Sequence, residues 1–208
     1  MTEKIVLLGA GALARDLIAI YGRERFAVAY VEPAFRNDQH VVSGVGIVSD
    51  WTRLLTQASH YLLAVADQDA RAALQARARA EGLIPCEPLV YPASFCAASA
   101  RMGRGSVVTC FVVLGDAAEI AEDTLIMHHT TVGHDSRVGD LSVVCPGVSL
   151  GGGSTLGRNC FVGANAVTAP GVSVGDAAVI AAGAACLADV PVGGFAIGSP
   201  ARRVARAG

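Results

Sequence analysis

Three of the five histidines of this 208-residue chain lie close together, at His128, His129 and His134. An imidazole titrates near neutral pH, so it can take a proton from an attacking amine or hydroxyl group. Asp135 follows His134 directly, and a carboxylate beside an imidazole fixes its tautomer and stabilises the imidazolium that forms. The pattern makes His134 the candidate general base of a transfer reaction and Asp135 its partner. It assigns no role to His128 or His129.

A second candidate site lies near the amino terminus. The segment Gly9-Ala10-Gly11-Ala12 follows residues 4–8, Lys-Ile-Val-Leu-Leu, and an acidic residue stands about 20 positions further on, as in a dinucleotide-binding turn. Ala14 occupies the place of the third glycine, and the unit is long enough for only one mononucleotide-sized half. We therefore expect a tight turn beside a small-molecule pocket, with NAD or NADP binding and a purely structural turn as alternatives. The expected acceptor-binding residues are Gly9, Gly11, Ala12 and Glu32.

Composition excludes several classes of partner. The formal net charge is −2 and the pI is about 6.2, so no basic surface is available to hold a nucleic-acid backbone. We find no secretory signal and no run of about 18 apolar residues, and we expect no membrane span. The six cysteines form no Cys-x-x-Cys pair. We expect them to be small buried side chains of a cytoplasmic protein in a reducing compartment.

Strand and helix patterns alternate in the first part of the chain. Strands are expected at residues 4–8, 27–31 and 60–66, and a helix carries the apolar stripe of Leu13, Leu17 and Ile20. A second helix is expected over residues 68–81, with Asp67 as its N-cap and Gly82 behind it. Alternation of this kind predicts a small parallel sheet with helices on its faces. We interpret residues 1–90 as a Rossmann-like α/β domain that binds the acceptor.

The second part of the chain repeats every six residues. Starting at Met102 and stepping by six, fourteen of fifteen residues are apolar, and Thr168 is the exception. Glycine often follows the apolar residue, and the fourth residue after it is small or valine. The positions are Met102, Val108, Leu114, Ile120, Ile126, Val132, Val138, Val144, Leu150, Leu156, Val162, Thr168, Val174, Ile180 and Cys186.

A period of six excludes the ordinary secondary structures. An α-helix has a 3.6-residue period and loses about 1 kcal/mol for each internal glycine, and a flat sheet has a period of two. A short strand and a turn on each side of a triangular prism fit the pattern, with three hexapeptides in each coil. Residues 91–208 are therefore expected to form a parallel β-helix of about five coils. Each buried Val, Leu or Ile contributes about 1.5–3 kcal/mol to the stack.

This array resembles the bacterial hexapeptide-repeat acyltransferases, whose β-helix is left-handed. The resemblance covers residues 102–203 and includes the terminal segment Gly198-Ser199-Pro200-Ala201-Arg202-Arg203, which is similar to the Gly-x-Pro-Ala-Arg ending of that family. With an α/β unit in front, the whole chain resembles the sialic-acid O-acetyltransferase and sugar-nucleotide N-acetyltransferase (NeuD/PglD-like) group. That group modifies bacterial glycans.

The resemblance implies a mechanism and a set of binding positions. The family carries its catalytic histidine in a segment like Val132-Gly133-His134-Asp135, and the acyl-CoA thioester is attacked directly, without a Ser or Cys nucleophile. The backbone N–H of Gly152 would stabilise the oxyanion, and Arg202 would pair with a CoA phosphate. Many relatives place a second histidine where this chain has Val143. Positions along the CoA arm are Val143, Gly152, Ala164 and Ala182.

The resemblance also implies partners. Acetyl-CoA or another acyl-CoA is the co-substrate, no metal is expected, and sites lie between the subunits of a homotrimer. Relatives that act on UDP-amino sugars carry a histidine in the first glycine turn and an acidic pair after the second strand. Here Ala14 replaces the histidine and Pro33 interrupts the acidic pair after Glu32. The expected function is transfer of an acetyl or other acyl group to an amino or hydroxyl group of a small acceptor, such as a sugar or sugar nucleotide.

Two other functions are open to this sequence. His129 and His134 are five residues apart, so a zinc lyase of the γ-carbonic-anhydrase type could share its metal across a trimer interface. That family lacks the α/β unit, and no third ligand is evident. The other alternative is a scaffold without catalytic activity that binds a nucleotide.

Overall fold

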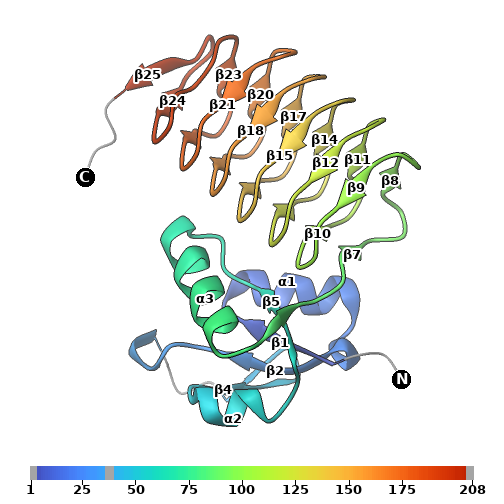
Figure 1. Ribbon diagram of the computed structural model, residues 1–208, viewed down its shortest axis with the longest axis vertical. Coiled ribbons are helices and arrows are strands. Elements are labelled where there is room, and N and C mark those ends of the chain that lie inside the picture. The colour runs from blue at the N-terminus through green and yellow to red at the C-terminus, as the bar shows by residue number, and fades with distance from the viewer. Residues whose placement is uncertain (1–3, 36–39, 205–208) are drawn as a thin grey trace. The chain divides into compact units, whose positions relative to one another are not determined.

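The computed structural model describes residues 4–35 and 40–204. The chain divides into two compact units, Met1–Cys86 and Glu87–Gly208. Figure 1 shows an α/β unit and a stack of short strands linked by tight turns. The division falls before the expected boundary at residue 90, because Leu89–Val90 is already a strand of the stack and pairs with Val107–Val108.

The first unit is built on a six-stranded sheet of order β3-β4-β2-β1-β5-β6. All neighbours are parallel except β3 and β4. The four residues of β1 and of β5 are buried, as expected for parallel strands covered on both faces. The strands are β1 (Ile5–Leu8), β2 (Phe26–Tyr30), β3 (Val41–Val42), β4 (Val45–Val48), β5 (His60–Leu63) and β6 (Ile84–Pro85).

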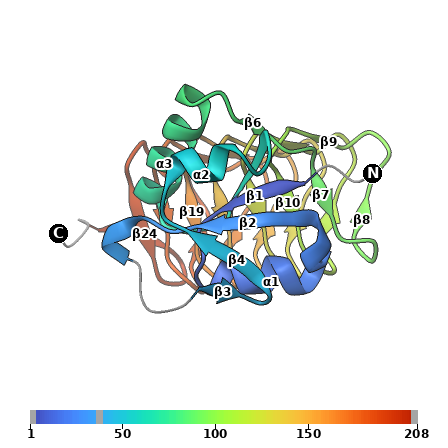
Figure 2. The same cartoon turned by 90° about the horizontal axis from the view of Figure 1, so that it is seen from below.

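Helices lie on both faces of this sheet, with α1 on one side and α2 and α3 on the other (Figure 2). Asp67 caps α3 as expected, because its carboxylate accepts a hydrogen bond of 2.9 Å from the Ala70 N–H. The strand expected over residues 60–66 ends at Leu63, and the sequence patterns did not predict α2, β3 or β4. The helices are α1 (Ala12–Tyr21), η1 (Arg23–Arg25), η2 (Pro33–Phe35), α2 (Trp51–Leu55) and α3 (Gln68–Ala80).

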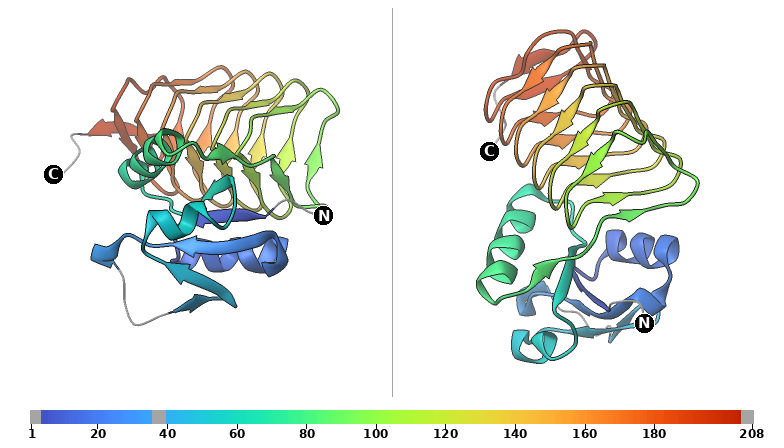
Figure 3. Two further views of the ribbon diagram at one scale, coloured as in Figure 1. Left: turned by 60° about the horizontal axis from the view of Figure 1, so that its bottom comes forward. Right: turned by 45° about the vertical axis from the view of Figure 1, so that its right-hand side comes forward.

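The second unit is a three-sided parallel β-helix, whose stacked coils are seen from two sides in Figure 3. Each side is one sheet, and we call the sides face 1, face 2 and face 3. Face 1 contains β7 (Leu89–Val90), β10 (Val107–Val108), β13 (Leu125–Ile126), β16 (Val143–Val144), β19 (Phe161–Val162), β22 (Val179–Ile180), β24 (Phe195–Ile197) and the antiparallel β25 (Arg202–Val204). Face 2 contains β8 (Phe95–Cys96), β11 (Val113–Leu114), β14 (Thr131–Val132), β17 (Ser149–Leu150), β20 (Val167–Thr168) and β23 (Ala185–Cys186). Face 3 contains β9 (Arg101–Met102), β12 (Glu119–Ile120), β15 (Arg137–Val138), β18 (Thr155–Leu156) and β21 (Ser173–Val174).

Each coil contributes one strand to each face, so the strands from β7 to β20 pair in parallel with their counterparts in the next coil, as Leu114 with Val132 and Val132 with Leu150. The second residue of each strand points inward, and the step-six aliphatic residues form one continuous dry core. Thr168, the polar member of the series, is 6% exposed. Its hydroxyl lies 3.0 Å from Ser154 Oγ and accepts a hydrogen bond from the Gly151 N–H. The core predicted from the period of six is confirmed.

The repeat starts earlier than the sequence indicated. Val90 and Cys96 keep the step of six and pack against the core, so the series of apolar positions begins two steps before Met102. Tyr91 and Ala97 follow them, so glycine marks neither of these two steps.

The turns impose a second regular feature. At every sixth position from Gly105 to Gly183 the backbone φ is positive, between +52° and +74°. Glycine, Asn and Asp tolerate this left-handed region best. Phe111, His129 and Leu141 also adopt it, although it disfavours bulky side chains.

Within the described residues, no helix is long and apolar enough to cross a bilayer.

Candidate functional site

His134 and Asp135 form the turn that follows β14, at the edge between face 2 and face 3. The His134 Nδ1–H donates to Asp135 Oδ2 over 2.8 Å. The two side chains are 71% and 70% exposed, so both point outward, as the hexapeptide register predicted. With Nδ1 occupied by the carboxylate, Nε2 is the atom left to accept a proton.

Gly152 occupies the same place one coil later, and its lack of a side chain makes room for the imidazole. A Cβ at position 152 would lie 2.4 Å from His134 Nε2 and 2.7 Å from Cε1. Gly133 is equally constrained, because its Cβ would lie 2.6 Å from the Gly152 nitrogen. The carbonyl of Gly152 accepts a bond of 2.9 Å from the Gly171 N–H, whereas its own N–H has no hydrogen-bond partner among the described residues. An uncommitted N–H thus lies beside the candidate base.

The expected cofactor positions do not lie together in one chain, and Gly152 is the one that lies beside His134. Ala164 and Ala182 lie one coil apart, in the turns that follow β19 and β22 on the edge between face 1 and face 2. The Ala164 carbonyl accepts from the Gly183 N–H over 2.8 Å, and a Cβ at Gly163 would lie 2.4 Å from the Ala182 nitrogen. Val143 instead lies within face 1, and its side chain is buried.

Gly152 lies beside His134 on the edge between face 2 and face 3, whereas Ala164 and Ala182 lie on the edge between face 1 and face 2. Face 2 separates the two edges, and five residues of chain at about 3.3 Å each span roughly 15 Å. A single chain does not bring His134 next to Ala164 or Ala182. Arg202 is exposed on β25, opposite Ile197 of β24, near the end of the stack.

The cysteines provide no rival nucleophile in the dry core. All six are free, and Cys86, Cys160 and Cys186 are buried. Burial raises the pKa of the Cys145 thiol and of the Cys160 thiol to about 11. Both are therefore protonated near neutral pH, and the thiolate is the reactive form.

The first unit contains a pocket of about 860 Å³ whose lining includes all four expected acceptor-binding residues. Gly9 has φ +131°, and a Cβ there would lie 2.5 Å from the Ala64 carbonyl oxygen, so only glycine fits this turn. Gly11 is the N-cap of α1, and Glu32 follows β2, the strand that pairs with β1.

Arg77 of α3 is a pocket residue that the sequence patterns did not reveal. Its guanidinium lies 3.4 Å from Glu32 Oε1, 3.4 Å from the Tyr30 hydroxyl and 4.4 Å above the centre of the Trp51 ring. Burial, together with the nearby Glu32 carboxylate, raises the pKa of Tyr30. The pocket therefore combines a glycine turn with a paired carboxylate and guanidinium, a set suited to phosphate, ribose and base groups.

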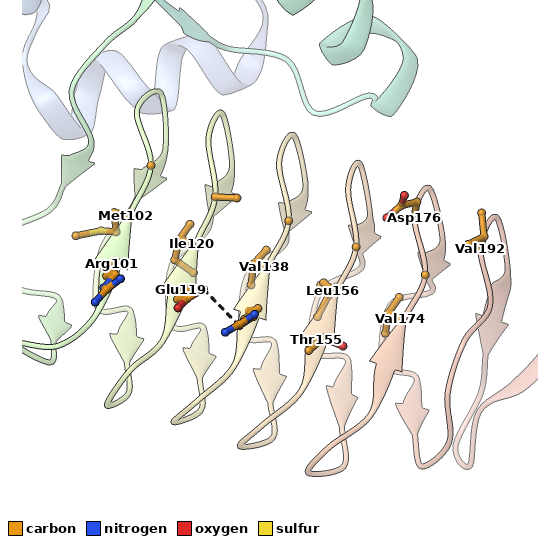
Figure 4. A pocket seen from close by; sticks show the side chains of 16 residues that line it. Arg101, Met102, Glu119, Ile120, Val138, Thr155, Leu156, Val174, Asp176 and Val192 are labelled. Carbon is orange, nitrogen blue, oxygen red and sulfur yellow. Dashed lines mark ion pairs between the residues drawn. The ribbon is translucent and has the colours of Figure 1, made fainter.

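A second hollow, of about 730 Å³, runs along face 3 and contains none of the expected site residues. Figure 4 shows Arg101, Glu119 and Thr155 along it, with the ion pair between Arg137 and Glu119 marked. That pair spans 3.3 Å, and both side chains are largely exposed. We regard this hollow as a solvated face. Among the described residues of one chain, no group of three His, Cys, Asp or Glu side chains is placed to hold a metal.

Comparison with known proteins bears on the fold of the chain. The hexapeptide repeat of succinyl-transferase matches residues 155–187. PerB from Caulobacter crescentus, solved with CoA and GDP-perosamine, matches with a TM-score of 0.87 and 26% identity over 99% of each chain. A variant of perosamine N-acetyltransferase from that organism, in which one histidine is replaced by asparagine, gives 0.88 and 26% over 99% of each chain.

The acetyltransferase domain of PglB from Neisseria gonorrhoeae, solved with acetyl coenzyme A, matches with a TM-score of 0.85 and 24% identity, over 98% of this chain and 100% of that domain. A search of curated proteins gave no match. The predicted fold is confirmed: a Rossmann-like α/β unit precedes a left-handed parallel β-helix.

Proposed function

We infer that this chain is an acyl-CoA-dependent acyltransferase of the hexapeptide-repeat group, and we propose that its acceptor is an amino sugar carried on a nucleotide. One observation carries the proposal: an exposed imidazole bonded to a carboxylate at Nδ1, with Nε2 above a glycine whose N–H is uncommitted among the described residues. PerB, solved with CoA and GDP-perosamine, is the relative that suggests the acceptor class.

In this mechanism the acceptor amine attacks the thioester carbonyl carbon while His134 Nε2 takes its proton. Asp135 keeps the Nδ1–H in place and stabilises the imidazolium. The carbonyl oxygen becomes an oxyanion and accepts a hydrogen bond from the Gly152 N–H. The carbon–sulfur bond then breaks, and the proton passes from His134 to the departing CoA thiolate. The products are an amide and free CoA.

We place the CoA arm along the edge that carries Ala164 and Ala182. Their small side chains leave the backbone open, and the two residues repeat at the spacing of one coil. A pantetheine arm has amide groups that can bond to such a backbone ladder. Val143 is assigned to this groove only by the resemblance, and Arg202 would meet a CoA phosphate near the end of the stack.

We place the nucleotide of the acceptor in the pocket of the first unit. Gly9, Gly11 and Ala12 would hold the diphosphate at the start of α1, where backbone N–H groups and the helix dipole favour an anion. Glu32 and Arg77 would bond to the ribose or to the base. The residues required for this assignment come from the turn between β1 and α1, the start of α1, the segment after β2, and α3.

We propose a homotrimer in which face 2 packs against other copies. The outward residues of face 2 are all uncharged: Phe95, Val113, Thr131, Ser149, Val167 and Ala185. Phe95 is 64% exposed. Face 3 instead points Arg101, Glu119 and Arg137 outward. Threefold packing through face 2 would bring the His134 edge of one copy to the Ala164 edge of the next. We further propose that the enzyme works in the reducing cytoplasm, which suits six free cysteines.

Release of CoA from acetyl-CoA tests the proposed function, with GDP-perosamine and dTDP-4-amino-4,6-dideoxyglucose as acceptors. Wild type should release thiol only when an acceptor is present. His134→Ala should lower kcat by about 10²–10⁴-fold, the range of general-base catalysis. His40→Ala, at an exposed histidine of the first unit, is the matched control and should keep wild-type activity. Full activity of His134→Ala would overturn the mechanism.

A further inference from the structure

Four rings gather on the edge between face 1 and face 2. Phe111 and His129 are stacked, with ring centres 5.3 Å apart and planes at 19°. Tyr91 meets Phe111 edge-on at 6.3 Å, and His128 meets His129 edge-on at 5.9 Å. They stand in the turns after β7, β10 and β13. We call Tyr91, Phe111, His128 and His129 the ring row.

The backbone at the ring row is unfavourable for the side chains it carries. Phe111 has φ +57° and His129 has φ +59°, in the left-handed region that glycine occupies at the equivalent Gly147 and Gly183. Phe111 is also 55% exposed, so burial within the chain does not offset the conformational cost. The stack imposes this left-handed turn at every sixth position, so the feature that points to a binding role is the exposed ring at this position rather than the strain itself.

The ring row shares its edge with the proposed cofactor positions. Moving one coil at a time along this edge leads from Phe111 to His129, Gly147, Asn165 and Gly183, and Ala164 and Ala182 are their neighbours. When the threefold axis runs parallel to the axis of the prism, residues with the same number in the three copies lie at the same position along that axis. His134 of one copy is then level with His128 and His129 of the next, and the CoA arm lies on the later coils.

We propose that the ring row binds the sugar ring of the acceptor, on the opposite side of the reacting thioester from the CoA arm. This inference rests on the proposed function and names the subsite that holds the reacting sugar. The C–H face of a pyranose is apolar and stacks on a flat ring, while the imidazole nitrogens can bond to its hydroxyl groups. The same arrangement accounts for two bulky residues in left-handed turns on one edge.

Phe111→Gly tests the ring row, because it removes the ring and relieves the backbone at once. The acceptor KM, measured with GDP-perosamine or dTDP-4-amino-4,6-dideoxyglucose, should rise about tenfold, as expected for loss of an aromatic contact. The KM for acetyl-CoA should stay within about twofold. The melting temperature should stay equal or rise, since glycine tolerates φ +57°.

Ala177→Gly is the matched control. Ala177 has φ +55° and is exposed, on the edge between face 3 and face 1, so this variant changes the backbone freedom but no ring. It should keep the acceptor KM of wild type. An unchanged acceptor KM in Phe111→Gly would overturn the inference. A raised KM accompanied by a lower melting temperature and loss of trimer would also overturn it, because the rings would then be packing groups between copies.

Saturation-transfer NMR with a methyl glycoside of 4-amino-4,6-dideoxyglucose tests the subsite without turnover. Wild type should transfer saturation to the ring protons of the sugar, and Phe111→Gly should lose most of that transfer. No transfer in wild type would contradict the ring row as a sugar subsite. If transfer occurs but neither nucleotide sugar is acylated, the proposed reaction fails while the subsite stands.

Discussion

The two units of this protein build their candidate sites in opposite ways. In the β-helix, the backbone repeats with every coil, and the candidate base is a local departure from the repeat at His134 and Asp135, completed by Gly152 one coil later. In the α/β unit, the pocket takes residues from Gly9 to Arg77, which only the sheet topology brings together. A repeat therefore turns sequence spacing into spatial neighbours, whereas an open sheet does not.

The two sites are also expected to control different steps of the reaction. Substitutions at the His134 edge should change the rate of the chemical step, because the imidazole and the oxyanion donor meet the reacting atoms. Substitutions in the α/β pocket should change the affinity for the acceptor alone. Three variants test this division, in order of expected effect.

Gly152→Ala should have the largest effect of the three. Its methyl group would occupy the point 2.4 Å from His134 Nε2, so the imidazole must move, and a misplacement of about 1 Å costs roughly 100-fold in rate. The rate of CoA release at saturating substrates should show kcat lowered by about 100-fold. Gly46→Ala, where a Cβ meets no atom within 4 Å, is the control. Equal rates for both variants would break the link between Gly152 and catalysis.

Asp135→Asn should have a smaller effect, about 10- to 30-fold on kcat, because the amide keeps the shape but stabilises the imidazolium less. The 2.8 Å bond to Nδ1 is exposed, so water replaces part of what the carboxylate supplies. Steady-state rates with saturating acetyl-CoA and acceptor measure the change. A variant as slow as His134→Ala would mean that the amide NH₂ donates to Nδ1 and leaves the proton on Nε2, so that the imidazole cannot act as the base.

Arg77→Ala should have the smallest effect and the most selective one. Losing the guanidinium frees Glu32 and uncovers the Trp51 ring, so the acceptor KM should rise about tenfold with kcat unchanged. Arg53→Ala, at an exposed arginine of α2, is the control. A fall in kcat at saturating acceptor would show that the two units do not divide the work as proposed.

The sequence predicted more of the β-helix than of the α/β unit, for the same reason. The period of six predicted the core and the outward direction of His134, since every contact in the stack is a fixed number of residues away. Gly152 was named from the family resemblance, and the structure places it one coil after His134. The series counted from Met102 left out Val90 and Cys96, which keep the step of six and pack against the core. In the α/β unit, the start of α3 was predictable because its N-cap, Asp67, is a local feature of the sequence. Arg77 and Trp51 gave no signal, because their pairing with Glu32 and Tyr30 depends on strand order.

The ring row shows a limit of another kind. His128 and His129 are visible in the sequence, but their stacking partner Phe111 is one coil away, and its positive φ is a property of the turn rather than of phenylalanine. Only the structure shows that a bulky residue occupies a position suited to glycine. Deviations from the repeat were thus as informative as the repeat.

The central claim is that each active site combines the His134 edge of one copy with the cofactor edge of the next. Mixed trimers of two defective variants, His134→Ala and Ala182→Trp, test it directly by CoA release after co-expression with two different tags. Each variant alone should be nearly inactive. In an equal random mixture about one site in four would combine two intact edges, so about a quarter of wild-type activity should return. Mixed trimers that form but remain inactive would contradict a shared site, since a site within one chain would always carry one of the two defects.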